Sequence, residues 1–124
     1  MVEMAIVMPL FLMLLFGIME AGWAFSQQVE MRNATREGAR LAVVDWGTGD
    51  QVIDETCSRA DLSGAGTTFT VTVNTESVTV NASKTYQSLT GMIDGFAGLT
   101  MSSSVEMRTE RALDVLTDAS KVCP

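Results

Sequence analysis

The 124-residue sequence contains no histidine, which removes a side chain that the usual catalytic triads and most zinc sites require. It also lacks a phosphate-cradling glycine loop and a nucleophile motif, and its acidic residues are scattered along the chain. We therefore expect no enzyme activity, no catalytic residues, no metal site and no cofactor.

Basic residues are also scarce. Eight lysines and arginines face 15 aspartates and glutamates, which gives a formal net charge of -7. The basic residues form no long run. This acidic excess argues against a nucleic acid partner.

Only two cysteines occur, Cys57 and Cys123, and they are too far apart in sequence for a CxxC redox site. In an exported domain an even pair predicts a disulfide, which would close a loop of about 66 residues and stabilise by roughly 4 kcal/mol. The alternative is a pair of buried free thiols in a cytosolic protein.

No charged residue lies between Glu3 and Glu20, and the sequence stays helix-favouring and free of proline from there to Gly47. We predict one long helix over residues 1–47, apolar over about 1–25 and amphipathic over about 26–47. Its length of roughly 70 Å exceeds what a small domain needs for its own core. Part of it must therefore project into lipid or into copies of the same chain.

Two other interpretations of this run are weaker. A cleavable secretory signal has a positively charged front region and a clear stop after a short apolar stretch, and this sequence has neither. A buried core helix would need more covering sequence than the rest of the chain supplies. A membrane span needs about 20 apolar residues, and Met4–Phe25 has about that length with Glu20 as its single charged residue.

The acids at the two ends of the run are candidate assembly residues. An acid inside a bilayer is costly and usually functional. The nearest basic residue to Glu3 in sequence is Arg32, about 40 Å away along a helix, so another subunit's α-amino group, on Met1, is its natural partner. For Glu20 the candidate partner is an arginine of an axially shifted copy.

Three arginines spaced by four residues should share one face of the amphipathic part: Arg32, Arg36 and Arg40. That face is either a solvated or headgroup-facing surface, or the partner of Glu20 or Glu30 in a neighbouring copy.

Pro9, Gly17 and Gly22 interrupt the apolar part. They either let the helix bend or stretch inside a filament, or are simply tolerated in a membrane helix.

Residues 48–124 predict a globular head, and the whole chain predicts an α+β fold with a small antiparallel sheet. Thr67–Val73 alternates apolar and polar residues, as does Ser77–Ser83, with a short polar link between them. These two runs predict a β-hairpin over about 67–83. Before it we expect the long helix to end at Gly47 and a short helix, capped by Asp50, to cover about 50–60. After it we expect a short helix or loop over 84–98, a third strand over about 99–108, and a short C-terminal helix that includes Ala112, Val115, Leu116 and Ala119.

The front third resembles the N-terminal region of type IV pilin-like proteins, and more closely the TadE-like pseudopilins of tight-adherence (Flp-type) pilus systems. Three blocks carry this resemblance in the family's order and approximate spacing: Val2–Leu10, Leu15–Gly22 and Ala34–Arg40. Beyond about residue 47 the resemblance is only architectural.

The resemblance implies a precursor in the bacterial inner membrane that a prepilin peptidase cuts and an assembly machinery extracts into an extracellular helical filament. Its partners would be copies of itself or other pilins. Glu3 would take the role of the family's glutamate, which lies five residues after the cut; here it is third, a departure from that pattern. The implied function is a structural pilus subunit or minor component for adhesion or surface attachment. The alternative is a single-pass anchor that presents a small binding head.

Overall fold

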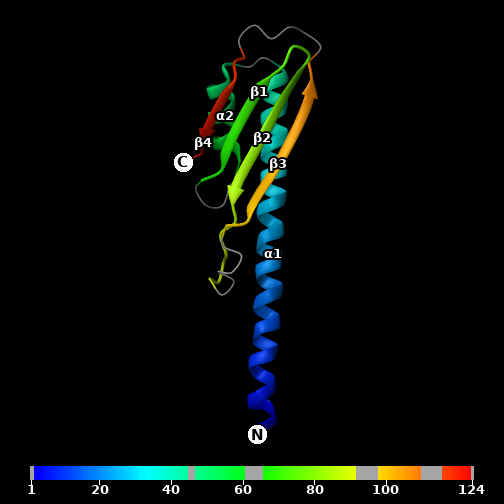
Figure 1. Cartoon of the computed structure of the whole chain (residues 1–124), viewed down its shortest axis with the longest axis vertical. Coiled ribbons are helices and arrows are strands. Elements are labelled where there is room, and N and C mark those ends of the chain that lie inside the picture. The colour runs from blue at the N-terminus through cyan, green and yellow to red at the C-terminus, as the bar shows by residue number, and fades with distance from the viewer. Residues whose placement is uncertain (1, 45–46, 61–65, 92–97, 110–115, 124) are drawn as a thin grey trace.

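The computed structural model of the chain describes residues 2–44, 47–60, 66–91, 98–109 and 116–123. It shows a long N-terminal helix that carries a small head at its C-terminal end (Figure 1). The elements in chain order are α1 (Val2–Val43), α2 (Gly49–Arg59), β1 (Thr68–Val73), β2 (Ser77–Thr85), β3 (Thr100–Arg108) and β4 (Ala119–Val122). The predicted α+β fold is confirmed.

Helix α1 spans 42 residues, which corresponds to a length of about 63 Å. It begins with an acidic residue, Glu3, in the first turn and ends with a basic residue, Arg40, in the last turn, as the helix dipole favours. The helix continues through Pro9. Its first half projects beyond the head, and its second half forms one wall of the core (Figure 1).

The four strands form one antiparallel sheet in the order β3-β2-β1-β4. Val71 pairs with Val80 in the β1–β2 hairpin, and Val80 pairs with Val105 of β3. Phe69 and Val71 are buried while Thr68, Thr70 and Thr72, which alternate with them, are only partly covered, because successive side chains of a strand point to opposite faces. The alternation in the sequence therefore builds one apolar face.

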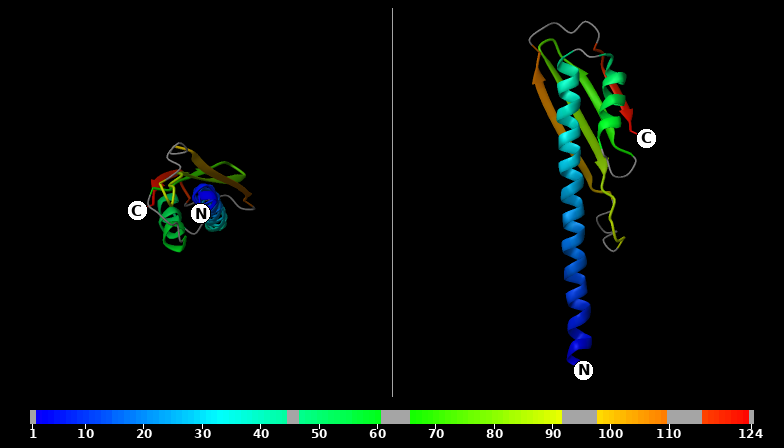
Figure 2. Two further views of the ribbon diagram at one scale, coloured as in Figure 1. Left: turned by 90° about the horizontal axis from the view of Figure 1, so that it is seen from below. Right: turned by 180° about the vertical axis from the view of Figure 1, so that it is seen from behind.

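Both helices cover that apolar face (Figure 2). Helix α1 contacts β2 and β3, and α2 contacts β1 and β4. The core between the layers is made of apolar side chains from α1 and α2 and of the inward-facing residues of β1 and β2: Met31, Ala34, Ala39, Leu41, Ala42, Val52, Ile53, Phe69, Val71, Val78, Val80 and Ala82.

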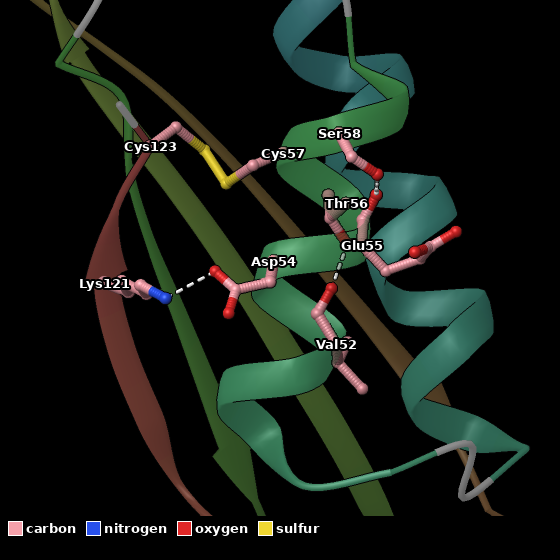
Figure 3. The surroundings of a disulfide bond; sticks show 8 residues. All are labelled: Val52, Asp54, Glu55, Thr56, Cys57, Ser58, Lys121 and Cys123. Atoms are coloured by element: carbon pink, nitrogen blue, oxygen red, sulfur yellow. Dashed lines mark hydrogen bonds and ion pairs between the residues drawn. A yellow bond between two sulfur atoms is a disulfide. The ribbon is translucent and has the colours of Figure 1, made fainter.

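The disulfide between Cys57 and Cys123 is present, with Cα atoms 5.7 Å apart (Figure 3). It joins α2 to the residue after β4. A salt bridge from Lys121 of β4 to Asp54 of α2 runs beside it. The Cys123 amide also donates a hydrogen bond to the Thr67 carbonyl at 2.9 Å, so the end of the chain is fixed to both layers.

Two predicted helix boundaries were wrong. Helix α1 ends at Val43 rather than at Gly47. The residue that caps α2 is Thr48 rather than Asp50, and the Thr48 amide donates a hydrogen bond to Gln51 Oε1 at 3.0 Å. Asp50 lies in the first turn of α2, where an acid still interacts favourably with the helix dipole.

The predicted C-terminal helix was wrong at its end, because Ala119 begins strand β4; residues 110–115 lie outside the described residues. Strand β4 pairs with the edge of β1 that β2 leaves open, from Thr68↔Val122 to Val71↔Ala119. These backbone hydrogen bonds outweigh the weak helical spacing of the local sequence.

We predict that opening the disulfide destabilises the head. The double variant Cys57→Ser/Cys123→Ser should lose about 4 kcal/mol of unfolding free energy, because the unfolded chain regains the freedom of a 66-residue loop. Denaturant unfolding of the full chain in detergent measures this loss. Reductant should lower the stability of the wild type to the same level and leave the variant unchanged; a wild type insensitive to reductant would contradict the prediction.

A second prediction concerns Gly49, where an added Cβ would lie 2.1 Å from the Thr117 carbonyl oxygen. Because that oxygen is backbone, Gly49→Ala should cost about 1–3 kcal/mol of unfolding free energy. Gly17→Ala is the matched control, since a Cβ there meets nothing within 4 Å. Equal unfolding midpoints for the two variants would show that the segment before β4 does not pack on α2.

Candidate functional site

The most unusual surface of the molecule is the first half of α1. We call Met4–Met19 the apolar stem. It contains no charged residue, and its large side chains are exposed on every side of the helix: Met4, Ile6, Val7, Met8, Leu10, Phe11, Leu12, Met13, Leu14, Leu15, Phe16, Ile18 and Met19. A helix that is apolar all round is suited to a lipid or protein interior. The helix is long and apolar enough to cross a membrane.

Glu3 lies exposed in the first turn of α1, at the end of the helix farthest from the head. Its predicted partner, the amine of Met1, lies outside the described residues. Pro9 lies on the stem, and both Gly17 and Gly22 have no neighbouring atom within 4 Å of where a Cβ would stand. Among the described residues, therefore, none comes close enough to require a glycine at either position.

Glu20 is different, because its side chain is only 3% exposed and is held by the head. The Tyr86 hydroxyl donates a hydrogen bond to Glu20 Oε1 at 2.6 Å, and the Leu89 amide donates to the same oxygen at 2.9 Å. Thr90 donates to Oε2 from its amide at 3.3 Å and from its hydroxyl at 3.1 Å. Both carboxylate oxygens therefore have partners from one short segment of the head.

We call that segment, Tyr86–Gly91, the foot. It continues from β2 and extends along α1 toward the N-terminus (Figure 1). The Tyr86 amide donates to the Leu99 carbonyl at 2.8 Å, which extends the β2–β3 pairing to the base of the foot. Higher on the helix, Gln27 donates to the Gln87 carbonyl at 3.4 Å. These contacts bring the donors to the level of Glu20.

Tyr86 is itself affected by this arrangement. Burial and the hydrogen bond to the Glu20 carboxylate raise the pKa of Tyr86 to about 12, because both disfavour a phenolate at this place. The hydroxyl thus remains a donor at any physiological pH.

An apolar groove of about 370 Å³ lies between the helix and the head, beside Glu20 and Tyr86. The helix contributes small residues, which leave room beside the backbone, and the head contributes larger ones; the lining residues are Gly17, Glu20, Ala21, Ala24, Tyr86, Leu99 and Met101.

The three arginines predicted to share a face are all exposed. Arg40 is used within the chain, since it forms an ion pair with Glu37 at 3.0 Å. Glu37 also pairs with Arg59 of α2 at 3.2 Å, and the Arg40 guanidinium lowers the pKa of the Glu37 carboxyl. Arg32 and Arg36 point to solvent on the same amphipathic part of the helix.

Sequence reasoning identified Glu20 as a buried acid but missed its partners. These lie 66 to 70 positions farther along the chain, and three of the four donors are a backbone amide or a threonine group, which no motif reveals. The one available signal was Tyr86, the only tyrosine of the chain, at the end of an apolar-alternating strand.

Within the described ranges, no group of three or more histidine, cysteine, aspartate or glutamate side chains is placed to hold a metal ion.

Residues 1–40 match the sequence model of the TadE-like protein family. The matched region contains the apolar stem, Glu3 and Glu20, and it leaves α2 and the sheet outside. No curated protein and no solved structure matches the chain. The family match indicates a protein associated with Tad pili, with a location at the membrane or in the pilus.

We predict that Tyr86, the only tyrosine of the chain, loses its proton at a higher pH than an ordinary tyrosine does. Its absorbance near 295 nm should change with a midpoint of about 12 in the folded protein, and Glu20→Gln should move the midpoint toward the ordinary value of about 10. Tyr86→Phe, the control, should show no transition. Because the folded-state pKa is raised, the contribution of Tyr86 to stability is complete below about pH 10 and is lost as the pH rises to about 12.

Circular dichroism at each pH verifies that the chain is still folded. A wild-type midpoint near 10 in the folded protein would contradict the contact between Tyr86 and Glu20.

Proposed function

We propose that this chain is a non-enzymatic, pilin-like structural subunit of a Tad pilus. It waits in the bacterial inner membrane, is processed by a prepilin peptidase, and is then assembled with copies of itself or other pilins into an extracellular filament for adhesion or surface attachment. One observation carries this proposal: the exposed stem Met4–Met19 lies in the region that matches the TadE-like family.

The exposed stem supplies the force for assembly. Burying apolar surface stabilises by about 25 cal/mol per Å² of area removed from water. Lipid covers the stem before assembly, and the stems of neighbouring copies cover it in the filament. Its methionines suit this exchange, because the flexible thioether side chain fills irregular gaps between packed helices. The heads, attached at the other end of α1, then form the outer surface.

In this proposal Glu3 sets the axial register between copies. A carboxylate enclosed by packed stems needs a positive partner, and a neighbouring subunit's amine at Met1 supplies one. The dipole of α1 further favours an acid at this position. A mismatched register would leave Glu3 buried without a partner.

Glu20 has a different role from the one expected of an inter-subunit ion pair. Since its two oxygens already accept hydrogen bonds from Tyr86, Leu89 and Thr90, we propose that it sets the position of the head on the helix. Copies that pack by their stems then present their heads at a fixed height. Arg32 and Arg36 remain available on the surface for acidic groups of neighbouring copies.

Pro9, Gly17 and Gly22 are proposed to serve assembly rather than folding. Neither glycine has a neighbouring atom within 4 Å of a Cβ, so a larger residue would be felt only where another copy approaches. Pro9 lacks an amide hydrogen and so removes one helical hydrogen bond, which lets the stem adjust its length or direction.

The second candidate function is a single-pass membrane anchor that presents the head to a binding partner. The length and apolar character of α1 favour it as well. The two functions differ in what they require of Glu3, because a plain anchor has no use for an acid at the front of its span.

The deciding variant is Glu3→Ala in cells that produce the pilus. We expect sheared filaments to disappear, or this chain to be lost from them, because the register contact is absent. Glu3→Gln should cause the same loss, because the contact with a neighbouring amine requires the negative charge of Glu3. Glu76→Ala is the matched control: it removes an exposed pair with Arg108, and such pairs contribute little.

Electron microscopy and mass spectrometry of the sheared fraction measure the result. Normal amounts of filament that contain the Glu3→Ala chain would overturn the register role. A wild-type chain found only in the membrane fraction, beside filaments that lack it, would favour the anchor.

A further inference from the structure

We propose that the foot, together with Leu99, is a lipid-contacting surface that seats the head on the bilayer while the chain is in the membrane. This inference rests on the proposed membrane-inserted state and adds to it the depth at which the head sits. The partner surface is the boundary between the acyl chains and the headgroups.

The length of the apolar stem is the first argument. The 16 residues between Glu3 and Glu20 span about 24 Å along a helix. The hydrocarbon core of a bilayer is about 30 Å thick. An upright stem is therefore too short to hold both carboxylates outside the hydrocarbon, and a tilted stem is shorter still across the bilayer. At least one of the two carboxylates must therefore lie at the hydrocarbon boundary or inside it, and we place Glu20 there because its own head supplies its hydrogen bonds.

The hydrogen bonds of Glu20 are the second argument. Donors at 2.6 to 3.3 Å from Tyr86, Leu89 and Thr90 fix the foot at the same height as this carboxylate. The foot therefore lies at the same depth in the bilayer as the Glu20 carboxylate. The foot also supplies the hydrogen bonds that water would otherwise give, which makes a carboxylate tolerable at the boundary.

The composition of the foot is the third argument. Its sequence from Tyr86 to Gly91 carries no charged side chain, and neither does the base at Leu99–Met101. Leu89 and Leu99 are 51% and 55% exposed. Both therefore offer apolar contact at the level that the length of the stem assigns to lipid.

Aromatic residues at this height agree with the same boundary. Trp23 and Phe25 follow Glu20 on α1, and Phe25 is 72% exposed. Tyr86 of the foot lies at the height of Glu20, to which its hydroxyl donates a hydrogen bond. Trp and Tyr are enriched at membrane interfaces because their rings combine an apolar body with a polar group.

The apolar groove connects this surface to the stem, since Gly17 of the stem lines it from the helix and Leu99 lines it from the head. Lipid that surrounds the stem reaches the groove and the foot with no further partner. This continuity favours lipid over a second copy as the occupant in the membrane.

The test places a nitroxide label on the full chain in vesicles of phosphatidylethanolamine and phosphatidylglycerol. Because both native cysteines are in the disulfide, a cysteine introduced by Leu89→Cys or Leu99→Cys is the only reactive thiol in that variant. Collision rates with oxygen, which concentrates in lipid, and with a water-soluble nickel chelate report where each label lies.

Two control positions give the reference values for lipid and for water. Phe11→Cys labels the middle of the stem, and Thr75→Cys labels the exposed β1–β2 turn at the opposite end of the sheet from the foot (Figure 1). We expect the ratio of oxygen to nickel collisions at positions 89 and 99 to exceed the ratio at position 75 several-fold and to fall below the ratio at position 11.

Each other outcome overturns the inference in a different way. Lipid-like values at position 11 with water-like values at 89 and 99 would overturn the foot contact and leave the membrane-inserted state standing. Water-like values at position 11 would overturn both. Dipolar broadening at 89 or 99 that disappears when labelled chain is diluted with unlabelled chain would assign the surface to a second copy.

Discussion

The structure depends on a mismatch between a 42-residue helix and a head that covers only half of it. From Met31 onward, α1 is an ordinary core helix packed on a sheet and on α2. Before Glu20 it is apolar on all sides and exposed. No rearrangement of so small a head could cover the stem, so the remaining burial must come from lipid or from other chains. The membrane-inserted state and the assembled state that we propose would each meet this requirement.

Glu20 lies between the exposed apolar stem and the part of α1 that packs on the head. A single carboxylate there would be costly in an apolar environment, yet this one is satisfied by Tyr86, Leu89 and Thr90 of its own head. The charge does not need a cation from a neighbour, unlike the one proposed for Glu3. Glu20 therefore holds the head to its own helix, whereas we propose that Glu3 interacts with a neighbouring chain, although the sequence presents the two acids as a similar pair.

The sequence predicted the features that rest on local periodicity. The long apolar run predicted α1, the alternation around Phe69 predicted the hairpin, and the even cysteine pair predicted the disulfide. It failed where distant segments decide the outcome. Ala119 lies in a strand because β1 had an open edge, and the partners of Glu20 are backbone and hydroxyl donors that carry no motif. The end of α1 at Val43 was missed because helix boundaries depend on capping and packing.

The direction of the strands has a mechanical consequence. All four strands run roughly along the axis of α1 (Figure 1). Ladder hydrogen bonds stand perpendicular to their strands, so a pull along the helix axis loads them in shear, many at a time, rather than one after another. The disulfide from Cys57 to Cys123 adds a covalent cross-tie at the short strand β4, where the fewest hydrogen bonds would share such a load. The head is thus built to resist tension along its long axis.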